Sequence, residues 1–305
     1  MLIGIHDADA EHMRGKTFPN YALMKIAAYH KARSDSVVWW MPILSEVCNL
    51  VYSSKVFDFT PENRELPLNT IKGGTGYDVK AELPPEIEAA TPDYSIYPNC
   101  DYAIGFLTRG CPNSCEWCFV PEKEGKIKPY RNWRELVRPD SNKLVLMDNN
   151  ILACSFGIQQ LISLIGSGYL LDLNQGMDAR LVDSHIAAII ARLSWDRYIR
   201  FSCDTLKQLE HISRAANLLK RYGVKPYRLY FYLLVTKDIE NAAVRVEGLK
   251  RLGSIRIYAQ AERNESRGIK PNAVQLEFAQ RYIYGGKFRT ETWWEYCKKR
   301  GLEVG

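Results

Sequence analysis

From residue 102 onward, short apolar runs alternate with helical stretches, and this alternation constrains the fold more than any other feature of the 305-residue sequence. Parallel strands need long crossover connections, which helices usually supply, so the pattern predicts repeated strand-helix units. Six runs are predicted to be strands: residues 102–107, 143–147, 169–173, 198–202, 228–235 and 254–258. Helices are predicted between them at residues 156–165, 184–193, 206–222 and 239–252. Because six units cannot close the usual eight-stranded barrel, we expect an α/β fold with a partial (β/α)6 barrel.

Residues 1–60 predict a separate, small α/β lobe with a degenerate Rossmann-like pattern. Apolar runs at 2–6, 36–41 and 49–53 read as strands, and helical periodicity covers 20–31. A strand, a crossover helix and a second strand favour a parallel pair, whose carboxyl edge would carry Asp7 and Asp9. Residues 61–98 are rich in Pro, Asp, Glu and Gly and predict a connecting arm with little regular structure. The partial barrel is expected at 99–265, and a helical C-terminal extension at 266–305, with 273–284 its clearest helix.

The bulk composition predicts a cytoplasmic protein that keeps its cysteines reduced. No run approaches the ~18 apolar residues of a membrane-spanning helix, and the N-terminal residues are too short and too acidic for a secretion signal. In the cytosol, eight Cys are read as thiols or metal ligands rather than disulfides. The net charge of +6 permits an anionic ligand without demanding DNA or RNA. Five Cys lie far apart in apolar contexts, and most of them are expected to be small buried hydrophobic residues: Cys48, Cys100, Cys154, Cys203 and Cys297.

The other three cysteines, Cys111, Cys115 and Cys118, follow the first predicted barrel strand with CxxxCxxC spacing. A 4Fe-4S cluster used for electron transfer normally takes four Cys, so three thiolates leave one iron open to a chelating ligand. A structural zinc site also uses closely spaced Cys, but it needs a fourth ligand. The histidines of the first 30 residues are remote in sequence, and there is no second Cys pair at finger-like spacing. The pattern therefore favours an iron-sulfur cluster over zinc.

The cysteine loop, with aromatic Trp117 just before its last Cys, resembles the signature of the radical S-adenosylmethionine superfamily. The resemblance covers about residues 58–265. It implies that the open iron binds the amino and carboxylate groups of S-adenosylmethionine, and that a reduced cluster cleaves this cofactor to a 5'-deoxyadenosyl radical. A flavodoxin- or ferredoxin-type reductant is implied as well.

The resemblance also implies cofactor contacts at three other strand ends. Asp148 and Asn149 follow the second strand, where the family contacts the methionine amino group, usually with a Gly-Gly-Glu-like sequence. Ser202 and Asp204 would reach the ribose hydroxyls, and Val235, followed by Thr236, would pack against adenine. For Asp148 and Asp204 the competing interpretation is helix N-capping, although one Asp can serve both purposes.

The segment Gln175-Gly-Met-Asp-Ala-Arg180 is another polar cluster at a strand end. The polar side chains of Gln175, Asp178 and Arg180 suggest contacts to substrate or cofactor, because sites of this architecture gather at strand ends. The alternative is a surface ion pair between Asp178 and Arg180, which would contribute little energy.

The front lobe resembles a shortened cobalamin-binding domain, with residues 18–29 as its first helix and Gly73-Gly-Thr-Gly-Tyr-Asp78 at the junction. Too few residues precede this junction for a complete domain, and no Asp-x-His-x-x-Gly supplies an axial ligand, so we do not expect cobalamin. The Gly-rich run also lacks the Lys-Ser/Thr and the preceding strand of a phosphate loop, and it predicts a turn.

The motifs Gly-Gly-Thr-Gly-Tyr-Asp, Pro-Asp-Tyr-Ser-x-Tyr and Thr-Arg-Gly-Cys resemble those of small radical enzymes of gut bacteria and their phages. Queuine lyases are comparable small radical enzymes, and they release 7-aminomethyl-7-deazaguanine from queuine. The resemblance implies a small, nucleobase-like substrate, with contacts from Asp7, Asn20, Tyr77, Asp78 and Asp178. A tRNA- or peptide-modifying radical enzyme and a non-catalytic iron-sulfur protein stay open as alternatives. We expect no membrane association and no direct nucleic-acid binding.

Overall fold

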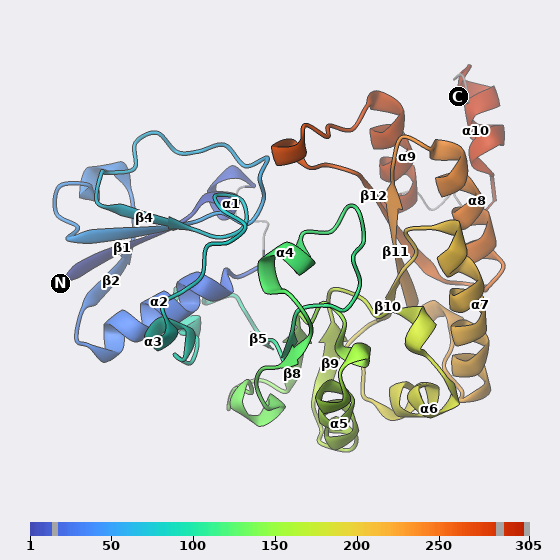
Figure 1. The fold of residues 1–305 in the computed structure, drawn as a ribbon, viewed down its shortest axis with the longest axis horizontal. Helices are drawn as coiled ribbons and strands as arrows, with labels where there is room; N and C mark the ends of the chain where they lie inside the picture. The colour runs from blue at the N-terminus through green and yellow to red at the C-terminus, as the bar shows by residue number, and fades with distance from the viewer. Residues whose placement is uncertain (14–17, 285–289, 302–305) are drawn as a thin grey trace. The chain divides into compact units, whose positions relative to one another are not determined.

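The computed structural model describes residues 1–13, 18–284 and 290–301 as a mixed α/β protein with parallel sheets (Figure 1). The chain forms two compact units. Unit 1 comprises Met1–Asp101 and Ser114–Gly125, and unit 2 comprises Tyr102–Asn113 and Lys126–Gly305. In the described part of the chain, no helix has the length and apolar character needed to cross a membrane.

Unit 1 is built on a four-stranded sheet in the order β2-β1-β3-β4, all parallel. Its strands are β1 (Leu2–Asp7), β2 (Ser36–Trp39), β3 (Leu50–Ser54) and β4 (Thr70–Gly73). The short helix α1 (Ala8–His12) follows β1, and α2 (Tyr21–Ala32) leads to β2. Asn20 begins α2, because its side chain accepts a hydrogen bond from the Leu23 amide at 3.2 Å. Strands β1 and β2, which α2 connects, pair in parallel, so the predicted parallel pair is confirmed.

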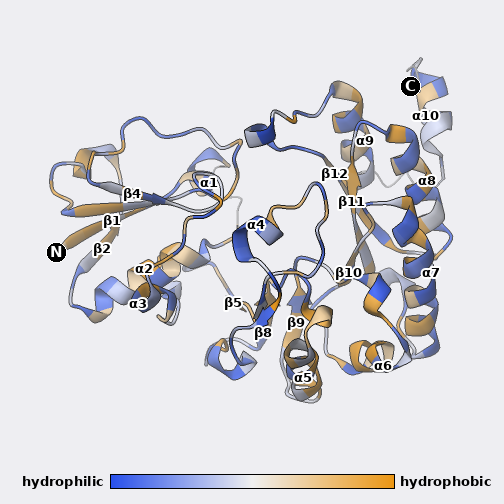
Figure 2. Ribbon diagram, in the orientation of Figure 1, coloured by the Kyte–Doolittle hydropathy of each residue, from blue (hydrophilic) through white to orange (hydrophobic). Residues whose placement is uncertain are grey.

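Residues 61–98, predicted as a connecting arm with little regular structure, contain a strand that was not predicted. Strand β4 lies inside this arm and extends the sheet beside β3, and the short helix α3 (Pro85–Glu88) follows. As an edge strand, β4 has half-buried ends and two exposed central residues, so its sequence lacks an apolar run. In Figure 2, β1 is hydrophobic over most of its length whereas β4 is mixed.

The Gly-rich run after β4 forms the predicted turn, in which the amides of Tyr77 and Asp78 both donate to the Gly74 carbonyl at 3.0 Å. Gly74 has a φ of +94°, and a Cβ atom there would lie 2.4 Å from the Lys55 carbonyl oxygen, so only glycine suits this position. The expectation that no strand precedes the run is wrong, because β4 ends at Gly73.

Unit 2 contains two three-stranded parallel sheets, β5-β8-β9 and β10-β11-β12. Each of the six predicted runs forms a strand: β5 (Ala103–Gly105), β8 (Lys143–Leu146), β9 (Leu170–Leu173), β10 (Ile199–Ser202), β11 (Leu229–Val235) and β12 (Arg256–Ala261). In the ranges that the structure describes, these sheets are not closed. A small antiparallel pair, β6 (Thr108–Arg109) and β7 (Lys128–Pro129), flanks the cysteine loop, whose own helix α4 (Val120–Glu124) belongs to unit 1.

The predicted helices and the helical C-terminal extension are confirmed within the described residues. They are α5 (Ser155–Leu164), α6 (Ser184–Arg192), α7 (Leu206–Arg221), α8 (Ile239–Lys250), α9 (Ala273–Tyr284) and α10 (Trp293–Arg300). Local sequence sets their starts: Asp183 caps α6, Asp238 caps α8, and Thr205 forms a capping box at α7. The last predicted residues, 302–305, and residues 14–17 and 285–289 lie outside the described residues.

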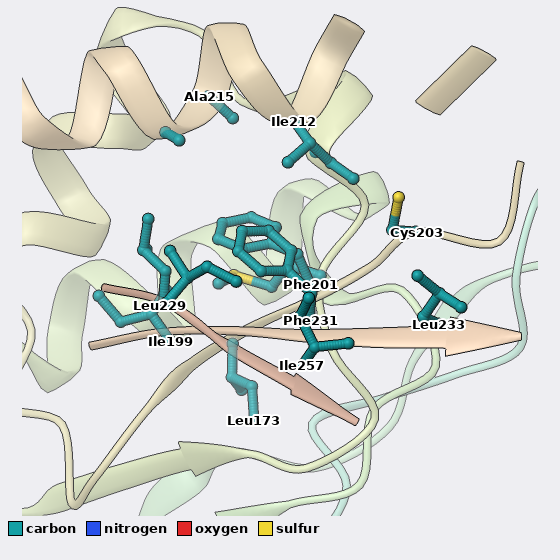
Figure 3. Close-up of a cluster of buried hydrophobic side chains, with 14 of the residues drawn as sticks. Leu173, Ile199, Phe201, Cys203, Ile212, Ala215, Leu229, Phe231, Leu233 and Ile257 are labelled. Atoms are coloured by element: carbon teal, nitrogen blue, oxygen red, sulfur yellow. The ribbon is translucent and has the colours of Figure 1, made fainter. Parts of the chain in front are cut away.

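The second sheet of unit 2 has two chemically different faces. On one face, Phe201 and Phe231 stack with ring centroids 6.1 Å apart and pack with Ile257 beneath α7, which contributes Ile212 and Ala215 (Figure 3). Along β11 the fully buried residues alternate with half-buried ones. Parallel strands covered on both faces are usually apolar throughout, so this alternation indicates that the other face has a different role.

Candidate functional site

The three loop cysteines differ from the other five in exposure. Cys111, Cys115 and Cys118 are half-buried, whereas the remaining five are buried, as predicted for small apolar side chains. Cys111 belongs to unit 2, and Cys115 and Cys118 belong to unit 1. Within residues 1–13, 18–284 and 290–301, no three His, Cys, Asp or Glu side chains form a group that could hold a metal ion.

The residues around Cys111 nevertheless fit an iron-sulfur ligand in their chemistry. The Nδ2 atom of Asn150 lies 3.7 Å from the Cys111 sulfur, and N–H groups beside such sulfurs tune a cluster. The Oδ1 atom of Asn150 is buried and has no hydrogen-bond partner among the described residues. Buried polar atoms are normally paired, so this oxygen has acceptor capacity left for a water molecule or a ligand. The ligands of a metal site often come together only when the metal binds. The three loop thiols can therefore serve as cluster ligands although they do not form a group in this structure.

Asp148 anchors the start of the cysteine loop. Its buried carboxylate accepts hydrogen bonds from the Leu107 amide at 3.0 Å, the Thr108 amide at 2.5 Å and the Thr108 hydroxyl at 2.6 Å. Burial raises the pKa of Asp148 to about 6, although these hydrogen bonds lower it. The N-capping interpretation is wrong, because the next short helix is preceded by Asn150. Asp148 therefore ties the end of β8 to the loop that carries Cys111. The neighbouring Asn149 is half-buried.

Asp204 and Ser202 lie at the carboxyl end of β10. Asp204 accepts a hydrogen bond from the Leu234 amide at 3.1 Å, which links the ends of β10 and β11, and burial raises its pKa. It does not cap α7, because Thr205 does, so the capping interpretation is wrong here too. Ser202 is half-buried, whereas Val235 is fully buried in the core of unit 2.

The half-buried face of the unit 2 strands carries polar and aromatic residues that were not predicted from the sequence. Arg200 forms two hydrogen bonds with the Asp172 carboxylate, at 2.7 and 2.5 Å, and its guanidinium lies 4.9 Å from the Tyr230 ring centroid. Tyr232 donates to the Asn174 carbonyl at 2.7 Å. Burial raises the pKa of Tyr230 and Tyr232, so both phenols stay neutral. The available signal was the Leu-Tyr-Phe-Tyr alternation of β11, which a strand covered on both faces would not need.

The predicted cluster after β9 forms the ion pair that was the alternative interpretation. Arg180 donates to both Asp178 oxygens, at 2.8 and 2.7 Å. Burial opposes ionisation, but the guanidinium outweighs it and holds the pKa of Asp178 below its usual range. Asp178 also accepts a hydrogen bond from Asn113 at 3.2 Å, and Asn113 lies between Cys111 and Cys115 in sequence. Gln175 and Arg180 are exposed.

In unit 1, three of the four predicted substrate residues lie at the carboxyl edge of the sheet, among buried polar groups. Asp7 accepts a hydrogen bond from the Tyr97 hydroxyl at 2.6 Å, and burial raises its pKa. Asn20 donates to the Ser54 hydroxyl at 2.8 Å, at the end of β3. Asp78 lies apart: it is exposed, and its carboxylate accepts from the nearby Lys80 amide at 2.8 Å. Trp117 is half-buried in the loop segment of this unit.

The third of these residues, Tyr77, ends a chain of four hydrogen-bonded side chains. Its hydroxyl lies 2.9 Å from the Ser53 hydroxyl, which lies 2.8 Å from Nδ1 of His6. The other imidazole nitrogen, Nε2, lies 2.9 Å from the Glu11 carboxylate, whose side chain is 57% exposed. This chain connects solvent at Glu11 with Tyr77 through two buried groups, so it can conduct a proton. His6, Ser53 and Glu11 were not predicted from the sequence.

No family model matches the sequence, and no curated protein matches it. The functional interpretation therefore depends on the residues themselves. Unit 2 combines an anchored cysteine with strand-end carboxylates, and unit 1 combines a buried proton-conducting chain with carboxamide and carboxylate groups.

Proposed function

We propose that this chain is a cytoplasmic radical S-adenosylmethionine enzyme that acts on a small, nucleobase-like substrate. The observation that carries the proposal is the CxxxCxxC loop. It follows β5, the first parallel strand of unit 2, with only the short strand β6 between them, and its three thiols are half-exposed while the five others are buried. Cys111, Cys115 and Cys118 would hold a 4Fe-4S cluster, which would supply the electron for reductive cleavage of S-adenosylmethionine and so the radical chemistry that removes hydrogen from the substrate. A flavodoxin- or ferredoxin-type protein would be the reductant.

We also propose that the two sheets of unit 2 are the halves of one open (β/α)6 barrel. Two isolated parallel bridges support this arrangement, because they continue the strand order from β9 to β10: Leu171 pairs with Trp195, and Met177 pairs with Phe201. In such a barrel, the carboxyl ends of the strands form the active-site edge. Asn150, Asp178 and Asp204 all follow strands at that edge.

The residues of unit 2 would have distinct tasks in this function. Cys111, with Cys115 and Cys118, would hold the cluster. Asp148 would position the loop through Thr108, and Asn150 would donate to the Cys111 sulfur and accept from the cofactor amine. Asp204 and Ser202 at the end of β10 would bind ribose hydroxyls, because carboxylate and hydroxyl oxygens accept hydrogen bonds from such groups.

For the substrate, we propose queuine, which the enzyme would cleave to 7-aminomethyl-7-deazaguanine. The support is chemical: a purine-like base needs flat aromatic neighbours and acceptors for its N–H edge. Unit 1 offers the acceptor Asp7, the carboxamide Asn20 and the aromatic Tyr77 at one sheet edge. A tRNA methylthiotransferase would need three further Cys ligands for a second cluster, yet Cys48 and Cys100, which precede the loop, are both buried.

The test is anaerobic reconstitution followed by reduction with dithionite in the presence of S-adenosylmethionine and queuine. We expect 5'-deoxyadenosine and 7-aminomethyl-7-deazaguanine by mass spectrometry. A Cys115→Ala variant should lose the cluster and both products, whereas the matched control Cys154→Ala should keep them. A fully loaded protein that releases no 5'-deoxyadenosine would refute the radical enzyme and favour a non-catalytic iron-sulfur protein. Formation of 5'-deoxyadenosine without cleavage of queuine would remove queuine alone.

A further inference from the structure

A cavity of about 490 Å³ opens at the amino-terminal edge of the second sheet of unit 2, and neither the cofactor nor the substrate proposed above uses it. Its volume is within the ~300–1,000 Å³ that is usual for small-molecule sites. Three arginines and two tyrosines line it, with Asp196 as the single acid: Arg197, Arg228, Arg256, Tyr198 and Tyr227.

The parallel register explains why the three arginines meet. Arg197 precedes β10 by two residues, Arg228 directly precedes β11, and Arg256 begins β12. Because Ile199 pairs with Leu229, and Tyr230 pairs with Arg256, the three strand starts lie side by side. The carboxyl ends of the same strands, where Ser202 and Asp204 lie, form the opposite edge. The cavity is therefore a separate site.

The cavity lining has an excess of positive charge, because its three arginines outnumber its single acid, Asp196. In the part of the chain that the structure describes, Arg197, Arg228 and Arg256 form no ion pair; the arginines that do form one lie elsewhere. Arg228 is oriented by hydrogen bonds to the Trp195 and Arg197 carbonyls, both at 3.4 Å, and such bonds leave its charge unneutralised. Guanidinium groups bind phosphate through paired N–H donors. An anion with phosphate oxygens is the natural complement of this cavity.

Helix dipoles do not account for these arginines. Basic residues at helix C-termini interact favourably with the dipole, as Arg192 and Arg251 can at the ends of α6 and α8. Arg197 and Arg256 lie outside the helices, at the starts of strands, and Arg228 ends the three-residue 3-10 helix Pro226–Arg228, which is too short to have a substantial dipole. Their convergence on one cavity therefore calls for a different explanation.

The aromatic lining makes the anion more specific. Tyr227 is 59% exposed, and Tyr198 is half-buried with Arg197 lying 5.0 Å from its ring centroid. Exposed tyrosines beside a cationic groove are a common platform for stacking bases. We infer that this cavity binds a nucleotide, either free or as one unit of an RNA strand, with the phosphate on the arginines and the base on Tyr227.

Direct binding to the purified full-length chain tests this inference independently of radical chemistry. Guanosine monophosphate, guanosine and inorganic phosphate would be titrated by calorimetry, and a short fluorescent single-stranded RNA by anisotropy. The double variant Arg197→Glu/Arg256→Glu changes two exposed side chains and should keep its fold, which circular dichroism checks. Each lost guanidinium contact should weaken binding about tenfold. The control Arg251→Glu, an equal charge change at the exposed end of α8, should change affinity less than about twofold.

The outcomes separate the two sources of the nucleotide. Binding of guanosine monophosphate that the double variant abolishes indicates a free nucleotide, and binding of RNA alone with the same loss indicates a unit of a strand. Tyr227→Ala should weaken guanosine monophosphate but not inorganic phosphate. The inference is overturned if no probe binds, or if Arg251→Glu weakens binding as much as the double variant does. It is also overturned if inorganic phosphate binds with the same affinity as guanosine monophosphate and Tyr227→Ala changes neither affinity.

Discussion

Replacing Asp148 by Asn tests how the cysteine loop is held. The folded chain keeps a proton on Asp148 up to a pH of about 6, whereas in the unfolded chain this proton is lost near pH 3.8. Between these values the folded state binds more protons, so the contribution of Asp148 to the free energy of unfolding falls as the pH rises. The interval between 3.8 and about 6 corresponds to about 3 kcal/mol. The carboxamide of the Asp148→Asn variant does not titrate and carries no such dependence.

The assay is denaturant unfolding of the cluster-free protein between pH 4 and pH 7, read as the difference between the wild type and Asp148→Asn. Because pH 4 lies just above 3.8, most but not all of this interval is covered, and we expect the difference to shift by about 2 kcal/mol in favour of the wild type at the acidic end. Asp140→Asn is the matched control, because Asp140 pairs with Arg138 at a side-chain exposure of 65%. A difference that stays constant with pH would show that Asp148 is not a buried, proton-binding anchor.

Asp148→Asn should also weaken the hold on the loop at neutral pH. The Asn amide presents N–H donors where the carboxylate accepts from the amides of Leu107 and Thr108, so at least one buried donor loses its partner. Because Thr108 is close to Cys111 in sequence, we expect slower or incomplete iron uptake, measured as iron and sulfide content after anaerobic reconstitution. Equal iron content in both proteins would contradict this prediction, because it would show that the hydrogen bonds of Asp148 are not needed for cluster binding.

Three further changes have defined outcomes. Cys118→Ala should abolish cluster binding, and a variant that retains the full iron content would refute the assignment of this ligand. Ser53→Ala leaves a buried imidazole nitrogen of His6 without its partner and should cost about 1–3 kcal/mol in denaturant unfolding. Gly74 has a φ of +94°, and the Cβ atom of the Gly74→Ala variant would lie 2.4 Å from a backbone oxygen, so this change should lower the free energy of unfolding by about 1–3 kcal/mol. Gly125→Ala, at a φ of +68° with no atom within 4 Å, is its control and should cost less.

The sequence predicted the strands and helices well where burial imposes a period. Runs such as 228–235 must be apolar because one face is fully covered by helices, and capping residues such as Asp183 mark helix starts. Strand β4 escaped prediction because an edge strand with two exposed central residues needs no apolar pattern. The turn at Gly74 was predictable, because glycine and its neighbours carry the local signal.

The candidate site was less predictable because it depends on strand register. His6 and Ser53 are 47 residues apart in sequence and become neighbours only because β1 and β3 pair in parallel, with these two residues opposite one another. Asp148 shows the same difficulty in another form. Its position at a strand end was visible, but its hydrogen bonds to residues 107 and 108 require the pairing of β5 with β8. The residue types were visible, and the contacts were not.

The four-residue chain in unit 1 has a direction that its end groups determine. A Glu11 carboxylate only accepts hydrogen bonds, so Nε2 of His6 carries a proton, and in the neutral imidazole Nδ1 then accepts from Ser53. Ser53 then accepts from Tyr77, so the phenol proton points inward along the chain, and the Lys55 ammonium lies 4.6 Å from the ring centroid. Burial raises the pKa of Tyr77, so the phenol holds this proton. Imidazole ¹⁵N NMR at neutral pH should therefore report the Nε2–H tautomer of His6. The Nδ1–H tautomer would reverse the chain, because Ser53 would then donate to Tyr77, which could only donate a proton outward.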